Sequence, residues 1–265
     1  MKRGQTIFLA AIVIAIIVGV VVTLLPVPAA WQGSSAEFHF PVAAYSSMAC
    51  LHIGAVLLFL MGLSVYKAQL RRAYVMISIG IVAVALGTLQ ISLLSGLDAL
   101  DSGWSKNGGA VVPFVLSSLL LYLGIRSFAK LVGLRNLFTR SGIVLPVVIV
   151  LCGATAFLPH VHVTTTEIGF DVGSGISTWD ALLTLVSLLL MLQVRKHIGA
   201  HYTQAMTWLV LPLFTSFLIL TVELVHSFFA TSTTDLLSTM VTASTIISGL
   251  LWLRAGYAFA QTTEY

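Results

Sequence analysis

The sequence predicts an all-α polytopic membrane protein with eight transmembrane helices, arranged as two sets of four. Three observations carry this prediction. Hydrophobic residues make up 58% of the chain and charged residues 8%, long apolar runs recur along its whole length, and the basic residues fall on alternate connections. Runs of about 20 apolar residues match the ~30 Å hydrocarbon core of a bilayer. We therefore expect the lipid bilayer to be the main partner of the chain.

Charges, prolines or polar connections bound each of the eight predicted spans. The first span, 7–25, is longer than the ~7 to 15 apolar residues of a signal peptide, so we interpret it as a retained helix. The spans that follow are 47–66, 74–96, 110–129, 142–159, 177–194, 205–228 and 238–257. The connections between them are too short for a separate soluble domain.

The distribution of basic residues predicts the orientation in the membrane. Of the 13 Lys and Arg residues, 12 lie in or next to the termini and connections on the same side of the membrane as the termini. Only Lys106 lies in a connection on the opposite side. Because cytoplasmic loops carry an excess of Lys and Arg, we expect both termini in the cytoplasm, at a prokaryotic plasma membrane. These residues are spread over short turns and form no continuous stripe, which argues against nucleic acid as a partner. The remaining 12 are Lys2, Arg3, Lys67, Arg71, Arg72, Arg126, Lys130, Arg135, Arg140, Arg195, Lys196 and Arg254.

The two halves of the sequence align at an offset of about 130 residues, which indicates a duplication. The matched segments are Leu24-Leu25-Pro26 with Phe157-Leu158-Pro159, Thr88-Leu89-Gln90 with Thr221-Val222-Glu223, and Leu121-Tyr122-Leu123 with Leu251-Trp252-Leu253. Four helices return the chain to the side of the membrane on which it entered, so both repeats have the same orientation. They are therefore expected to be related by a two-fold axis along the membrane normal. We expect one four-helix bundle over 1–130 and a second over 131–265, within a single membrane domain.

Ionisable residues are costly inside a membrane, so the few that fall within the predicted spans are candidate site residues. Apart from the basic residues near the cytoplasmic ends of the spans, they are His52, Asp180, Glu223 and His226, all toward the predicted outer side, with Gln90 as the first-half counterpart of Glu223. Together these five residues form a predicted polar site in the outer leaflet. The alternatives are an interhelical hydrogen bond for Glu223 and a role for Asp180 at the start of its helix.

Histidines suggest haem b or a transition metal as candidate cofactors. In an extended segment the side chains of His160 and His162 point the same way, as a metal pair requires, but a polar cap over the outer ends of the helices is the simpler explanation. His52 and His226 are the only histidine pair at a depth that suits the two axial ligands of a haem. The predicted four-plus-four architecture resembles that of heme A synthase, a family with a histidine pair in each bundle. Here the spans 110–129, 177–194 and 238–257 contain no histidine.

Serine, threonine and glycine recur on one face of the last predicted span. This stripe consists of Ser238, Thr242, Thr245 and Gly249. In lipid, small residues allow two helices to approach closely and to hydrogen-bond across their contact. We expect this face to pack against another helix.

The sequence lacks four common catalytic motifs, and this argues against an enzymatic function. It has no Gly-x-Ser-x-Gly elbow, His-Glu-x-x-His helix, Cys-x-x-Cys pair or glycine-rich phosphate loop. The first functional expectation is a non-catalytic integral-membrane subunit or scaffold of a larger complex, such as a respiratory or electron-transfer complex, with other membrane subunits as partners. The alternative is a transporter of a small solute, protons or metal ions.

Overall fold

Seven α-helices of 20 to 30 residues form most of the structure, a computed structural model. It describes residues 3–27, 35–64, 68–96, 112–134, 161–163, 168–170, 172–228 and 234–263. The helices are α1 (Arg3–Thr23), α2 (Ser35–Met61), α3 (Ala68–Gly96), α5 (Val112–Leu131), α7 (Val172–His197), α8 (Ala200–Phe228) and α9 (Thr234–Thr263), and a 3-10 turn, η1 (Gly62–Ser64), follows α2.

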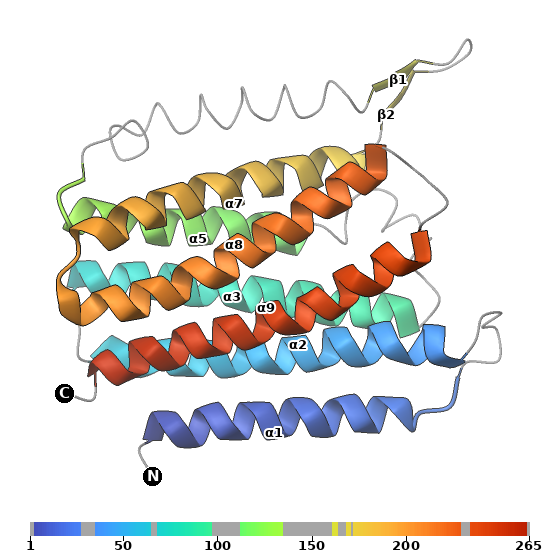
Figure 1. Cartoon of the computed structure of the whole chain (residues 1–265), viewed down its shortest axis with the longest axis horizontal. Coiled ribbons are helices and arrows are strands. Elements are labelled where there is room, and N and C mark those ends of the chain that lie inside the picture. The colour runs from blue at the N-terminus through green and yellow to red at the C-terminus, as the bar shows by residue number, and fades with distance from the viewer. Residues whose placement is uncertain are drawn as a thin grey trace.

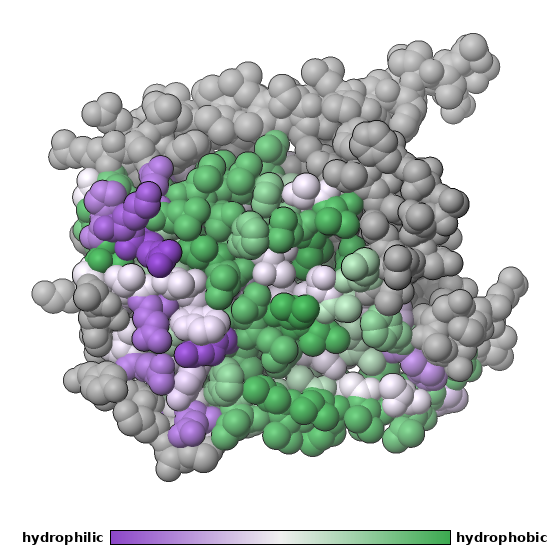
Figure 2. Space-filling view, in the orientation of Figure 1, coloured by the Kyte–Doolittle hydropathy of each residue, from purple (hydrophilic) through white to green (hydrophobic). Residues whose placement is uncertain are grey.

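Five of these helices contain segments that are long and apolar enough to cross a membrane. The segments are Arg3–Thr23, Phe38–Met61, Leu70–Leu93, Val112–Leu131 and Tyr202–Val222. Large apolar side chains on their outer faces remain exposed, for example Ile16 at 61% and Leu86 at 58%. Figure 2 shows hydrophobic residues across the middle of one face and a cluster of hydrophilic residues toward the end where the termini lie. The chain is thus a helical integral membrane protein, as its composition predicts.

Seven of the eight predicted spans coincide with helices, and the span at 142–159 lies outside the described residues. Several of the predicted spans are shorter than the helices that contain them. In particular, α2 begins at Ser35 rather than at residue 47 and contains Pro41. Polar residues between 35 and 46 interrupt the apolar run, but they do not interrupt the backbone hydrogen bonds of a helix. Pro41 lacks an N–H and its ring crowds the preceding turn, but it lies near the start of α2 and the helix continues past it.

A short antiparallel hairpin precedes α7. Its strands are β1 (Val161–Val163) and β2 (Ile168–Phe170), and His162 pairs with Gly169. The extended conformation considered for His160-Val161-His162 is therefore present over 161–163, whereas His160 lies outside the described residues.

Six of the seven helices form a closed ring. Each of α2, α3, α5, α7, α8 and α9 packs against the next in this order, and α9 packs back against α2. Helix α1 lies outside the ring, against α2 and more weakly against α9. In Figure 1, α1 accordingly lies at one edge of the molecule beside α2, and both termini lie at the same end of the bundle.

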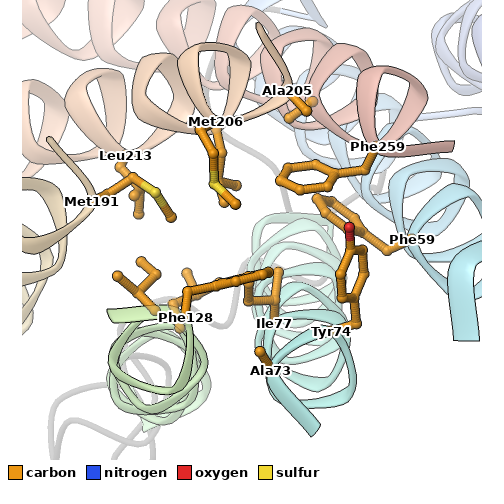
Figure 3. Packing of buried hydrophobic residues seen from close by; sticks show 14 of the residues in the cluster. Phe59, Ala73, Tyr74, Ile77, Phe128, Met191, Ala205, Met206, Leu213 and Phe259 are labelled. Atoms are coloured by element: carbon orange, nitrogen blue, oxygen red, sulfur yellow. The ribbon is translucent and has the colours of Figure 1, made fainter. Parts of the chain in front are cut away.

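Aromatic side chains fill the ring at the end where the chain termini lie. We call Phe59, Tyr74, Phe128 and Phe259 the aromatic plug. The ring centroid of Tyr74 lies 5.6 Å from that of Phe128 and 5.4 Å from that of Phe259, and Phe59 lies 5.2 Å from Phe259. Figure 3 shows these side chains, with those of Met191 and Met206, pointing into the space between the helices. Aromatic pairs at these distances add to the stabilisation from close packing.

Glycine permits the closest approach between α9 and α2. A Cβ atom added to Gly256 would lie 2.9 Å from the carbonyl oxygen of Ala55 and 3.1 Å from the Cβ of Leu58. Because the nearest atom belongs to the backbone, it cannot move away as a flexible side chain could. The seam between α2 and α9 therefore depends on glycine at this position.

We predict that Gly256→Ala destabilises the protein by about 1–3 kcal/mol, the usual range for overpacking a close contact. Gly199→Ala is the control, because a Cβ there meets no atom within 4 Å. Chemical denaturation in detergent, followed by circular dichroism, measures both variants. Equal stability of the two would contradict the close approach of α9 to α2.

Candidate functional site

The ring encloses a central cavity on the side of the aromatic plug that faces away from the chain termini. Its volume is about 220 Å³, and all six ring helices contribute to its lining. Leu121, Leu213 and Trp252 belong both to this lining and to the apolar core, so they separate the cavity from the plug. The polar lining residues are Tyr45, Thr88, Ser117, Ser118, Asp180, Thr184, Ser216, Thr245, Ser248 and Trp252.

Asp180 is the one carboxylate in the described part of this lining. It lies on α7, is only 3% exposed, and accepts a hydrogen bond at Oδ1 from the Ser118 hydroxyl of α5. Ser118 also lies 3.2 Å from the Thr184 hydroxyl, one turn along α7 from Asp180. Since the single Ser118 hydrogen is directed at Asp180, Thr184 is the donor to Ser118. The result is a hydroxyl chain that ends on the carboxylate.

Two other hydroxyls of the lining donate to their own helices, whereas the Ser117 hydroxyl is buried without a hydrogen-bond partner among the described residues. The Thr88 hydroxyl donates to the carbonyl of Ala85 at 2.9 Å, and the Thr245 hydroxyl donates to that of Thr242 at 2.6 Å. A hydroxyl that donates in this way keeps oxygen lone pairs as acceptors, and a carboxylate has only acceptors. The lining is therefore rich in acceptors, and a ligand with N–H or O–H donors is the chemical complement of this cavity.

His52 lies beside the cavity rather than in its lining. It is on the same face of α2 as the lining residues Tyr45 and Met48, and it is fully buried. Its Nδ1 lies 2.8 Å from the carbonyl oxygen of Met48. Because a carbonyl can only accept, Nδ1 carries the proton, and Nε2 is left as a buried acceptor with no hydrogen-bond partner in the described part of the chain.

The structure places only some of the five residues of the predicted outer-leaflet site near the cavity. Asp180 lines the cavity, and His52 lies one turn from a lining residue. Gln90 lies on α3 between Thr88 and Ile91, which both line the cavity, but is itself outside the lining. Glu223 and His226 fall within helix α8, and their side chains are outside the described residues.

The cofactor predictions remain predictions. The side chain of His162 is not among those described, and His160 is not described at all. Over the described residues, no group of three or more His, Cys, Asp or Glu side chains is placed to hold a metal ion. For a haem between His52 and His226, the two helices concerned are not neighbours in the ring, since α9 lies between α2 and α8.

Serines and threonines of the cavity are the functional candidates that sequence reasoning missed. Ser118 and Thr184, which hold Asp180, gave no individual signal, because isolated hydroxyl residues are common in membrane helices. Thr245 did stand out, but as part of a stripe predicted to pack against another helix. Gly249 of that stripe does pack against Met48 and Leu51 of α2, whereas Thr245 faces the cavity.

No family model matches the chain, and no curated protein or solved structure shows a significant match to it.

We predict that Ser118→Ala destabilises the protein by about 1–3 kcal/mol, because it leaves the buried carboxyl of Asp180 without its hydroxyl donor. Ser187→Ala is a matched control on α7. Its hydroxyl is buried but has no hydrogen-bond partner, so its removal should be neutral or slightly stabilising. Denaturant titration of both variants measures the difference. If Ser187→Ala were the more damaging of the two, Ser118 would not hold Asp180.

Proposed function

We propose that the protein is a membrane transporter for a small polar solute, with the central cavity as its binding site. The observation that carries this proposal is the acceptor-rich cavity around Asp180. A volume of about 220 Å³ lies below the range of ~300–1,000 Å³ that suits drug-sized ligands. The carboxylate and the free lone pairs favour a small organic cation or a small polyol over an anion.

The order of helix packing accommodates a site at the boundary between two repeats. In the closed ring, α2, α3 and α5 lie opposite α7, α8 and α9, the three helices that the proposed duplication of 1–130 and 131–265 assigns as their counterparts. In transporters built from such repeats, the substrate site lies near the midplane between the repeats.

The aromatic plug gives the proposed transporter its closed side. It lies within two turns of the helix ends that carry basic residues, such as Arg72 of α3, Lys130 of α5 and Arg195 of α7. By the positive-inside rule, we assign this end to the cytoplasm of a prokaryotic cell. Transport then requires the two halves of the ring to separate at the plug.

His52 favours a second candidate function, a non-catalytic subunit of a larger membrane complex that takes part in electron transfer. Its buried Nε2 has no hydrogen-bond partner, and a neutral imidazole with a free nitrogen is the form that binds iron or another transition metal. A reduced-minus-oxidised visible spectrum of gently purified protein, together with identification of the proteins that copurify, separates this candidate from the first. A haem band lost in His52→Ala would support the subunit.

Uptake into proteoliposomes tests the transport proposal. The probes are radiolabelled methylammonium as the small cation and radiolabelled glycerol as the neutral polyol. We predict that wild-type protein accelerates the uptake of at least one probe over protein-free liposomes. Ser248→Trp should return that rate to background, because Ser248 is buried and lines the cavity.

Ile247→Trp is the matched control for this experiment. Ile247 is the preceding residue of α9, is 53% exposed, and faces away from the ring interior. It should keep the wild-type rate. Loss of uptake in both variants, or wild-type uptake in Ser248→Trp, would contradict a route through the cavity. If neither probe enters faster than in empty liposomes and fixed partners copurify, the subunit becomes the better proposal.

Asp180→Asn identifies the charge of the transported solute. Since it removes the carboxylate and keeps nearly the same volume, we predict a loss of methylammonium uptake of about tenfold or more, with glycerol uptake retained. The measurement is the ratio of the two initial rates, compared between wild type and variant. An unchanged ratio would show that Asp180 does not select for positive charge.

A further inference from the structure

A second cavity lies between α3 and α5, outside the ring and near the helix ends that carry basic residues. Its volume is about 390 Å³. We call it the basic groove. Its lining consists of Arg72 and Met76 from α3 and Leu123, Arg126, Ser127, Lys130 and Leu131 from α5.

Three cations and no acid are found among the described residues that line the basic groove. Arg72 and Lys130 are exposed, whereas Arg126 is partly buried and its Nε has no hydrogen-bond partner. Like charges in one groove repel one another, and a buried guanidinium N–H without an acceptor carries a desolvation cost. An anion in the groove would relieve both effects at once.

The basic residues are not needed to cap the end of α5. There the backbone N–H of Leu134 donates to the carbonyl of Ala129 at 3.0 Å, and that of Gly133 donates to the carbonyl of Lys130 at 3.2 Å. Gly133 has a positive φ of 75°, so this is a Schellman motif that satisfies carbonyls at the helix end. The side chains of Arg126 and Lys130 are therefore not required to satisfy these carbonyls.

Apart from Leu131 at the very end of α5, the residues that line the groove change from charged to apolar with distance from the helix ends. On α5, Leu123 lies about one turn farther from the helix end than Arg126, and on α3, Met76 lies one turn farther than Arg72. Charged groups thus lie toward the membrane surface and apolar groups toward its centre. This is the order of the two parts of a phospholipid, a headgroup followed by acyl chains.

Arg254 follows Leu251-Trp252-Leu253, the segment aligned with Leu121-Tyr122-Leu123 before Arg126, and it has a different environment from Arg126. Its guanidinium carbon lies 4.5 Å from the centre of the Trp208 ring and 5.4 Å from that of Tyr257. These aromatic faces stabilise its charge from within the protein. Arg126 lines the basic groove instead, so the two arginines differ in their surroundings, although the Nη1 of Arg254 is also buried without a hydrogen-bond partner among the described residues.

We propose that the basic groove binds the phosphate group of an anionic phospholipid through Arg72, Arg126 and Lys130, with the first methylenes of its acyl chains against Met76 and Leu123. Basic pockets between transmembrane helices are suited to such headgroups. The site is separate from the central cavity, and it does not depend on the proposed transport function.

Native mass spectrometry of the detergent-purified protein tests this proposal. The protein is titrated with phosphatidylglycerol, with phosphatidylcholine of the same acyl chains, and with inorganic phosphate. We expect tighter binding of phosphatidylglycerol than of phosphatidylcholine. The double variant Arg126→Gln/Lys130→Gln should bind phosphatidylglycerol about 30-fold more weakly, or about fivefold for each cation removed.

Arg71→Gln is the control, because Arg71 is exposed on α3 next to Arg72 and does not line the groove. It should keep wild-type binding within about twofold. Lys130→Gln alone, an exposed position that is safe for folding, should weaken binding about fivefold. Equal binding of the two lipids, or an equal loss in Arg71→Gln and Lys130→Gln, would overturn the proposal. Binding of inorganic phosphate with the same residue dependence, but not of lipid, would overturn the lipid as ligand.

Discussion

The burial of Asp180 is the constraint on which the interior of this structure depends, and the hydrogen bond from Ser118 satisfies its carboxylate at one of the two seams where the first and second halves of the chain meet. Ser118 lies on α5, the last described helix of the first half, and Asp180 lies on α7 of the second half. Lipid cannot solvate a carboxyl group, so Asp180 must face protein or a polar cavity. A closed ring of helices meets this requirement, since it presents apolar side chains to lipid and keeps hydroxyls inside.

The ring interior changes character along its length. Toward the end with the chain termini it is packed with aromatic side chains and methionines, and toward the other end it opens into the hydroxyl-lined cavity. The packed part supplies dispersion contacts and a seal, whereas the cavity gives up contacts to leave room for a ligand. Such a division between a sealed half and a polar half is what a protein needs in order to hold a solute without leaking it.

Hydropathy and charge predict the helical membrane class well, because both follow from the free energy of placing side chains in lipid. They predict helix ends poorly, as α2 shows. Its backbone hydrogen bonds continue past the apolar run as far back as Ser35. Among the site residues, Asp180 could be predicted as an ionisable group within a span. Its partners Ser118 and Thr184 could not, since the distance between two hydroxyls on different helices depends on how the ring closes. The stripe on the last span predicts that Thr245 packs against another helix, and it lines the cavity instead for the same reason.

The central claim is that the six helices close into a ring around the cavity, and disulfide formation across the seam between α9 and α2 tests it most directly. A Cβ atom at Gly249 would lie 3.3 Å from the Cβ of Leu51, close to the ~3.5–4.5 Å of a disulfide. In a background without Cys50 and Cys152, Leu51→Cys/Gly249→Cys should form this disulfide in the membrane, as identified by mass spectrometry of linked peptides. Ile53→Cys/Gly249→Cys should not, because Ile53 is 49% exposed on the outer face of α2. A disulfide in Ile53→Cys/Gly249→Cys, with none in Leu51→Cys/Gly249→Cys, would contradict this account. The ring would then not close as described, and the cavity would have no wall on that side.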